Sequence, residues 1–148
     1  MIKVSIACPF EMEIDRGRLR ETVRAVLEGE GVQDAEVSVA LVDNATIHRL
    51  NKQYLDHDEP TDVLTFPLSG PGAKTLSGEL VIGGEIAKEQ AAERGHDVLA
   101  EVALYVIHGL LHLCGHDDHS EKDARAMHER ERQYLKKLGW PDVAPTTD

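Results

Sequence analysis

One segment constrains the fold of this chain more than any other. From Val98 to Cys114 the sequence reads VLAEVALYVIHGLLHLC, which is apolar on nearly every side of a helix. A helix without a polar face must be buried all round, and Gly115 supplies the left-handed geometry that commonly ends a helix. The segment is too short to span a membrane and, with one glutamate and two histidines, too polar. We therefore predict a buried central helix over residues 98–114.

Strands and amphipathic helices are expected in the rest of the chain. Apolar runs predict strands at residues 2–7, 36–42, 61–66 and 79–84. Capping residues and helical periodicity predict helices at residues 15–28, 44–54, 85–94 and 120–138, and a loop at residues 68–78. We expect one α+β domain over residues 1–148, in which a small mixed sheet of about four strands packs against helices. Residues 142–148 are expected to form a frayed tail.

Two histidines lie four residues apart on the predicted central helix, at His108 and His112. One helical turn places them on the same face, with Cβ atoms about 5–6 Å apart, which suits two imidazoles that bind one metal ion. The alternative is that each is an ordinary core histidine bonded to a backbone carbonyl. Burying two unpaired imidazoles on an otherwise apolar helix would be costly, so we expect both to be metal ligands.

The loop after this helix can supply a third ligand. Its sequence is Gly115-His116-Asp117-Asp118-His119, and the glycine allows the chain to double back. Carboxylates and imidazoles both bind zinc, so Asp118 and His119 are the two candidates, with His116 as a fallback. Asp117, or whichever of Asp118 and His119 is not a ligand, would transfer protons.

Two histidines followed by a turn and a third ligand are also typical of zinc endopeptidases of the metzincin type. Those enzymes carry a glutamate directly after the first histidine as general base, whereas this chain has Gly109. Three protein ligands still leave a position at which water can be activated. The pattern therefore predicts a metal-dependent hydrolase, with a metalloprotease-like peptidase or amidase as an alternative.

The net charge restricts how this chain can meet nucleic acid. With 16 basic and 27 acidic residues it carries −11, which argues against a broad basic surface for a phosphate backbone. Arg16, Arg20 and Arg24 recur every four residues and form either a stripe for RNA phosphates or a solvated helix face paired with glutamates. Residues 1–10 lack the long apolar core of a signal peptide, so we expect a cytoplasmic protein without membrane contact.

Three stretches together resemble the YbeY family of bacterial endoribonucleases. They are HGLLHLCGHDD at residues 108–118, PTDVLTFP at residues 60–67 and SGELVIGGEIA at residues 77–87. Met127 and Glu131 fall where the final helix of the family expects them. The similarity covers most of the chain, and the combination of the three stretches is highly specific.

This resemblance implies a zinc-dependent, single-strand-specific endoribonuclease with one zinc ion per chain. It implies action in 3′ end maturation of small-subunit (16S) ribosomal RNA and in ribosome quality control. The partners it implies are ribosomal RNA, the small ribosomal subunit, ribosomal proteins and assembly GTPases. The alternative is a non-catalytic ribosome assembly factor, which would bind the metal for stability and would not cleave RNA.

The chain departs from the family pattern at two positions. The third ligand of the family is a histidine six residues after the second, where this chain has Asp118, and His119 follows one residue later. Imidazole chemistry favours His119, whereas the family register favours Asp118. Because the register is intact and a carboxylate can bind zinc, we expect Asp118 to be the third ligand. The family also often has an arginine, suited to a scissile phosphate, at the position of Leu55. His57 lies close by and either substitutes as a donor when protonated or is simply solvated.

Overall fold

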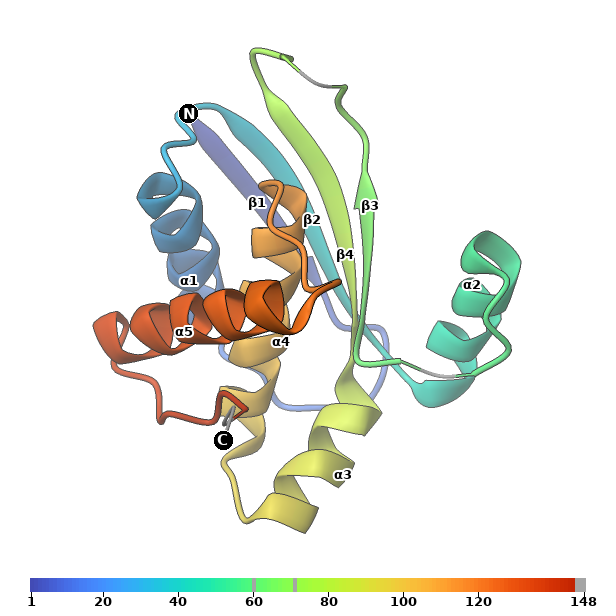
Figure 1. Ribbon diagram of the computed structural model, residues 1–148. Coiled ribbons are helices and arrows are strands. Elements are labelled where there is room, and N and C mark those ends of the chain that lie inside the picture. The colour runs from blue at the N-terminus through green and yellow to red at the C-terminus, as the bar shows by residue number, and fades with distance from the viewer. Residues whose placement is uncertain (60, 71, 146–148) are drawn as a thin grey trace.

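A four-stranded mixed sheet organises the chain (Figure 1). This computed structural model describes residues 1–59, 61–70 and 72–145. The strands are β1 (Ile2–Ala7), β2 (Ala35–Val42), β3 (Val63–Pro67) and β4 (Leu76–Gly83), in the spatial order β1-β2-β4-β3. Strands β1, β2 and β4 run parallel, while β3 pairs antiparallel with β4. The α+β class and the mixed sheet expected from the sequence are confirmed.

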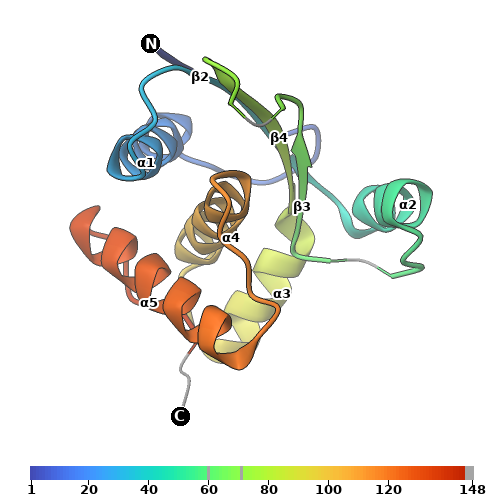
Figure 2. The same ribbon diagram turned by 45° about the horizontal axis from the view of Figure 1, so that its top comes forward.

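Helices cover both faces of this sheet. They are α1 (Arg16–Gly29), α2 (Asn44–Leu55), α3 (Gly84–Arg94), α4 (Val98–Leu113) and α5 (Glu121–Lys137). Figure 2 shows α1 and α4 on one side of the sheet and α2 on the other, with α5 lying outside α4. A large hydrophobic cluster accordingly involves α1, α4 and the sheet, and a small one lies beneath α2. Within the described ranges, none of the helices has the length and apolar character that crossing a membrane would require.

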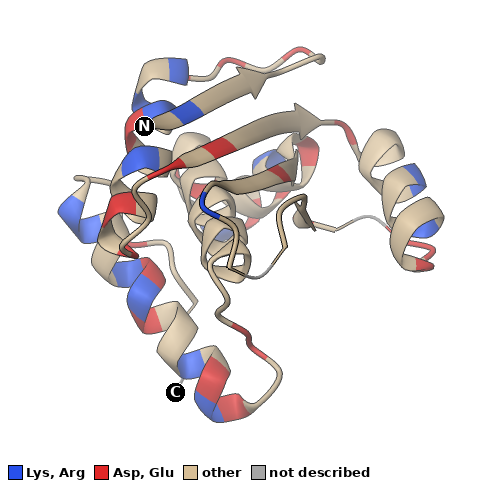
Figure 3. Cartoon of the chain, turned by 90° about the horizontal axis from the view of Figure 1, so that it is seen from above, with Lys and Arg blue, Asp and Glu red and all other residues tan. Residues whose placement is uncertain are grey.

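Charged residues of both signs are interspersed along α5 in the view of Figure 3. Two of its arginines pair with glutamates on the same helix: Arg125 with Glu121 at 3.0 Å and Arg132 with Glu129 at 2.9 Å. These cations are therefore partly neutralised within α5.

Short polar side chains set the beginnings of four helices. Asp15, Asp43, Asp97 and Ser120 each accept a hydrogen bond from a backbone N–H in the first turn of α1, α2, α4 and α5. Such caps satisfy donors that helix geometry leaves free. At the end of α3, Gly95 has a φ of 69°, a left-handed conformation that glycine adopts without strain. The helix boundaries agree with those predicted to within one residue at each end.

Strand β4 begins earlier than predicted. We expected a loop as far as residue 78, but residues 76–78 pair with residues 35–37 of β2. A Cβ atom on Gly78 would lie 2.6 Å from side-chain atoms of Leu113 at the end of α4. The glycine that suggested a loop is therefore the point at which the end of α4 approaches the sheet.

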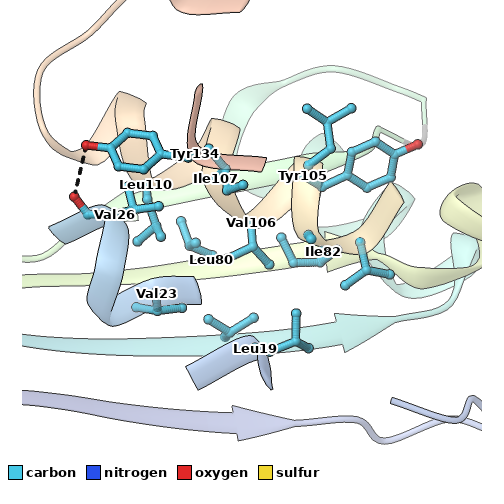
Figure 4. Close-up of a cluster of buried hydrophobic side chains, with 14 of the residues drawn as sticks. Leu19, Val23, Val26, Leu80, Ile82, Tyr105, Val106, Ile107, Leu110 and Tyr134 are labelled. Atoms are coloured by element: carbon cyan, nitrogen blue, oxygen red, sulfur yellow. Dashed lines mark hydrogen bonds between the residues drawn. The ribbon is translucent and has the colours of Figure 1, made fainter. Parts of the chain in front are cut away.

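Helix α4 is the buried element that the sequence predicts. Its Val106, Ile107 and Leu110 are fully buried, and they belong to one cluster with residues of β4 and α1 (Figure 4). The hydroxyl of Tyr134 on α5 reaches the Val26 carbonyl of α1 across this cluster, at 3.5 Å. Helix α4 is thus held between the sheet, α1 and α5.

Gly109 lies where α4 packs closely on the sheet. A Cβ atom there would lie 3.0 Å from Cδ2 of Leu80 and 3.1 Å from Cγ2 of Val63. Both distances are tighter than ordinary van der Waals contact, so a side chain at this position would have to displace packed neighbours. The position that follows His108 therefore faces β3 and β4.

The C-terminal segment remains packed beyond the point predicted. Val143 and Ala144 are buried and belong to the main cluster. Arg132 donates hydrogen bonds to the Asp142 carboxylate and to the carbonyl of Pro145. Residues 142–145 are therefore not the frayed segment we expected, because two apolar side chains find room in the core. The rest of the expected tail, residues 146–148, lies outside the described residues, as does Pro60 of the PTDVLTFP stretch.

Candidate metal centre

Two imidazoles converge at the C-terminal end of α4. The Nε2 atoms of His108 and His112 lie 3.1 Å apart, and their ring centroids are separated by 4.7 Å. Both side chains are largely buried, with exposed fractions of 21% and 28%. The four-residue spacing on one helix face accounts for this arrangement.

Asp118 returns to these imidazoles from the loop after α4. Gly115 makes the reversal possible, because its φ of 102° is accessible to glycine and strained for other residues. The Oδ2 atom of Asp118 lies 3.7 Å from Nε2 of His108 and 3.7 Å from Nε2 of His112. All three potential ligand atoms fall within 4.8 Å of one another.

The spacing of these atoms fits a small divalent ion. Zinc binds imidazole nitrogen and carboxylate oxygen at about 2.0–2.2 Å in tetrahedral geometry, so its ligand atoms lie about 3.3 Å apart. Observed separations of 3.1 and 3.7 Å bracket that value. Three protein ligands would leave one coordination position for water or substrate, which is typical of catalytic rather than structural zinc sites.

Hydrogen bonds fix which nitrogen of each ring faces the cluster. The Nδ1 atom of His112 lies 3.1 Å from the carbonyl oxygen of His116, which can only accept, so Nδ1 carries the proton. On His108, Nδ1 lies 2.6 Å from Oε2 of Glu131, a residue 1% exposed. Both Nε2 lone pairs then point toward the Asp118 carboxylate. A cation at this point would stabilise the converging lone pairs. Hydrogen-bond partners such as the Glu131 carboxylate and the His116 carbonyl commonly orient metal-binding histidines.

Negative charge surrounds His108. Burial of this imidazole lowers its pKa, but the hydrogen bond and charge of Glu131, together with the charges of Asp62 and Asp118, raise the pKa above its ordinary value. A field that favours an imidazolium also favours any other cation at the same place. The electrostatics therefore agree with the ligand geometry.

A second carboxylate, Glu30, anchors the metal-binding loop. Its Oε1 lies 2.6 Å from Nε2 of His116, while Oε2 accepts hydrogen bonds from Arg130 and from the Tyr134 hydroxyl. Burial raises the pKa of Glu30, but the hydrogen bonds from Tyr134, His116 and Arg130 and the charge of Arg130 more than offset this and lower it. The end of α1, the loop and α5 are thus joined at one carboxylate. Because the His116 carbonyl orients His112, this anchor also supports the ligand cluster.

A pocket of about 430 Å³ adjoins the cluster on the side of His108. Its lining includes Asp62, Arg94, His108, His128 and Glu131. No ion pair of Arg94 is found within the described parts of the chain, so its guanidinium is available to an anion entering this pocket. Concave sites with a few convergent polar groups are the usual places for ligands.

The remaining candidates in the metal-binding loop are arranged differently. His119 is exposed and does not belong to the ligand cluster. Its backbone N–H donates to Oδ1 of Asp117 at 3.3 Å. Asp117 is exposed as well. The structure thus brings Asp118, rather than His119, to the two imidazoles.

The residues predicted to contact substrate do not line the pocket beside His108. His57 is exposed and follows α2, where its backbone N–H bonds to the Asn51 carbonyl. Arg20 and Arg24 lie on α1, and Arg24 borders a separate pocket near the N-terminus. Leu55, at the position of the family's arginine, is 47% exposed. Besides His108 itself, the basic side chains that line this pocket are those of Arg94 and His128.

Sequence reasoning assigned no role to His128 and named Glu131 only as a family position. The sequence does carry a signal for this pair, because His128 and Glu131 lie three residues apart on the last helix. Five of the eight histidines of the chain also fall between residues 108 and 128. What the sequence did not reveal is that α5 would bring this pair against His108.

Comparison with known proteins gives a consistent result. Residues 8–139 match the model of one family, described as "Endoribonuclease YbeY". A protein of that name from Carboxydothermus hydrogenoformans is 45% identical over 121 residues, which cover 82% of this chain and 84% of the relative. Another, from Pelotomaculum thermopropionicum, is 40% identical over 129 residues, covering 82% and 85%.

A solved structure is similar in fold over nearly the whole chain. The solution structure of TM1509 from Thermotoga maritima superposes with a TM-score of 0.62 at 32% sequence identity. The match covers 93% of this chain and 89% of that protein.

Proposed function

Because the chain belongs to the YbeY family of endoribonucleases, we propose that it cleaves single-stranded RNA with one zinc ion held by His108, His112 and Asp118. Membership of the family makes it a hydrolase that acts on RNA. The identity of the ion, its ligands and the preference for single strands are our proposal.

One observation carries the zinc assignment: two Nε2 lone pairs and one carboxylate oxygen converge within 4.8 Å of one another. The Nδ1 atoms of both rings are already occupied by Glu131 and by the carbonyl of His116. Two nitrogens and one oxygen suit zinc better than magnesium or calcium, which prefer oxygen ligands alone.

Different residues of the chain would serve different roles in such a reaction. When bound, a zinc ion would supply Lewis-acid chemistry that polarises phosphoryl oxygens and makes water a stronger nucleophile at neutral pH. Glu131 and the His116 carbonyl keep both imidazoles oriented toward the ion. Arg94, on the wall of the adjoining pocket, is available to bind phosphate oxygens in the absence of an arginine at position 55. Asp117 lies in the same loop as Asp118 and is available for proton transfer with solvent.

We further propose that the RNA is the 3′ end of small-subunit (16S) ribosomal RNA, matured and monitored in the cytoplasm where ribosomes assemble. The small ribosomal subunit, its proteins and assembly GTPases would then be the partners. The resemblance of the three sequence stretches to the YbeY family supports this proposal. With a net charge of −11, the chain would need such partners, or local cations such as Arg20, Arg24 and Arg94, to retain RNA.

The test is cleavage of a labelled RNA that spans the 3′ end of 16S ribosomal RNA, offered as a single strand and annealed to its complement. Zinc-loaded protein should cut the single strand internally and spare the duplex. Protein stripped with a chelator, and the His112→Ala variant, should be at least about 100-fold slower, since three-ligand sites lose their ion when a ligand is removed.

Casein serves as the control substrate for the peptidase alternative. Hydrolysis of casein with intact RNA would contradict the proposal in favour of a peptidase. If zinc stabilises the fold while neither substrate is cut, the non-catalytic assembly factor is the better description.

A further inference from the structure

A single buried carboxylate holds two imidazoles beside the pocket. Glu131 on α5 bonds through Oε2 to Nδ1 of His108 at 2.6 Å and through Oε1 to Nδ1 of His128 at 2.9 Å. Its side chain is 1% exposed. A carboxylate at this depth must be hydrogen-bonded to be tolerated, and here both oxygens are used. The proposed metal ligand and His128 therefore share one rigid anchor.

The other nitrogen of His128 remains available. The ring is 22% exposed and lines the same pocket as His108. Its Nε2 atom has no hydrogen-bond partner among the residues that the structure describes. With Nδ1 bound to a carboxylate, Nε2 is the atom that a molecule in the pocket would meet. This is the arrangement of a carboxylate–imidazole pair poised for proton transfer.

We propose that His128 is a catalytic residue, the proton donor to the leaving oxygen when the RNA backbone is cut. This inference rests on the proposed function. In the step, water oxygen forms a new bond to phosphorus and the bond from phosphorus to the leaving ribose oxygen breaks. The Nε2 proton of the His128 imidazolium passes to that ribose oxygen, and the attacking water releases its proton to solvent. His128 then regains a proton from solvent.

The other polar groups of the pocket are less suited to this task. Arg94 cannot release a proton at any ordinary pH. Asp62 is exposed, and a carboxylate accepts a proton rather than donating one. The Tyr105 ring is buried, and its burial, followed by the charge of Glu101, raises the pKa of the hydroxyl. An imidazole both donates and recovers protons near neutral pH, which leaves His128.

The test compares His128→Asn with His48→Asn. An asparagine at position 128 can keep the hydrogen bond to Glu131 through its amide nitrogen while removing Nε2. His48 is a matched control: its Nε2 bonds to Asp58 at 2.7 Å, but it lies on α2 and does not line the pocket. We expect His128→Asn to lower kcat on single-stranded RNA by about 100-fold, the lower end of the range for general acids. The KM and the zinc content should stay unchanged, and His48→Asn should match wild type.

The pH profile adds a readout that a structural role would not move. A proton donor must be protonated, so kcat of the wild type should fall on the alkaline side, and this fall should be absent in His128→Asn. Asp62, Arg94, Tyr105, His108 and Glu131 face the same pocket and are present in both proteins, so the comparison isolates His128. His128→Gln, which cannot transfer a proton from a ring nitrogen, should behave like His128→Asn.

Three outcomes would overturn the assignment. One is a His128→Asn or His128→Gln variant with wild-type kcat. The second is a loss of kcat that accompanies a loss of zinc or of the folded state, because His128 would then act only through His108. The third is an alkaline fall that persists in both variants. A wild-type protein that does not cut RNA at all would instead refute the proposed function, and this inference with it.

Discussion

At position 118, a carboxylate in place of the histidine of the family changes the charge of the candidate metal centre. Two neutral imidazoles and one carboxylate would leave a bound Zn²⁺ with one net positive charge, whereas three imidazoles would leave two. A smaller charge attracts a phosphate less strongly. Arg94, the arginine that lines the adjoining pocket, therefore matters more to substrate binding than it would beside three histidines.

The choice between Asp118 and His119 as third ligand can be tested directly. We expect Asp118→Ala to weaken zinc binding by more than about 100-fold. Removal of a residue that only hydrogen-bonds to a metal ligand already weakens binding by up to about 100-fold, and removal of the ligand itself should weaken it more. His119→Ala should keep wild-type affinity, since the exposed ring lies outside the cluster. Competition titration with a chromogenic zinc chelator measures both. Equal losses in the two variants would mean that the loop rearranges to place His119 on the ion.

At the scale of elements, α4 could be predicted from sequence and the role of α5 could not. The burial of α4, its two histidines and its terminal glycine all lie within one continuous segment, so local periodicity was sufficient. The role of Glu131 and His128 depends on where α5 crosses α4, which is a property of tertiary packing. The same holds for Glu30, whose partners lie 86 to 104 residues away.

The preference for Asp118 illustrates an intermediate case. The family register favours Asp118 and ligand chemistry favours His119. Neither the register nor the ligand chemistry determines the path of the loop. The path is set by Gly115 and by the bond between the His116 side chain and Glu30. The sequence therefore reduces the choice to two residues and favours Asp118, and the path of the loop brings that residue to the imidazoles.

Glu30 should make the junction of α1, α5 and the metal-binding loop sensitive to acid. Its pKa is lowered in the folded protein, so its contribution to stability is present above the unfolded pKa of about 4.3 and is lost as the pH falls through the lower folded value. We expect Glu30→Gln to reduce the free energy of unfolding by about 2 kcal/mol at pH 7, as for hydrogen bonds to charged groups. Urea unfolding at pH 7 and pH 3 should show this difference shrinking at the lower pH.

The matched control for this junction is Glu28→Gln. Glu28 lies on the same helix and is exposed, so its replacement should change stability by less than about 0.5 kcal/mol at either pH. A Glu30→Gln penalty that is equal at pH 7 and pH 3 would show that the carboxylate charge contributes nothing.

On the scale of the whole molecule, the metal should couple to folding. Its proposed ligands join the buried α4 to the loop that leads into α5, and such a site exists only in the folded chain. At a free zinc concentration 100 times the Kd, binding adds about 2.7 kcal/mol of stability. For a chain of this size that corresponds to a rise in Tm of about 8 °C. Differential scanning fluorimetry with and without zinc measures it, and His112→Ala should show no rise.

The contact of Gly109 with Leu80 and Val63 limits which chemistries this scaffold can acquire. The position at which related metal-site helices carry a proteolytic base here contacts two strands, so a glutamate placed there would require the Leu80 and Val63 side chains to shift. A base for peptide-bond cleavage would meet no such obstacle if it came from a loop or from α5. The close approach of α4 to the sheet thus opposes the one substitution that would give the ligand helix the general base of a peptidase.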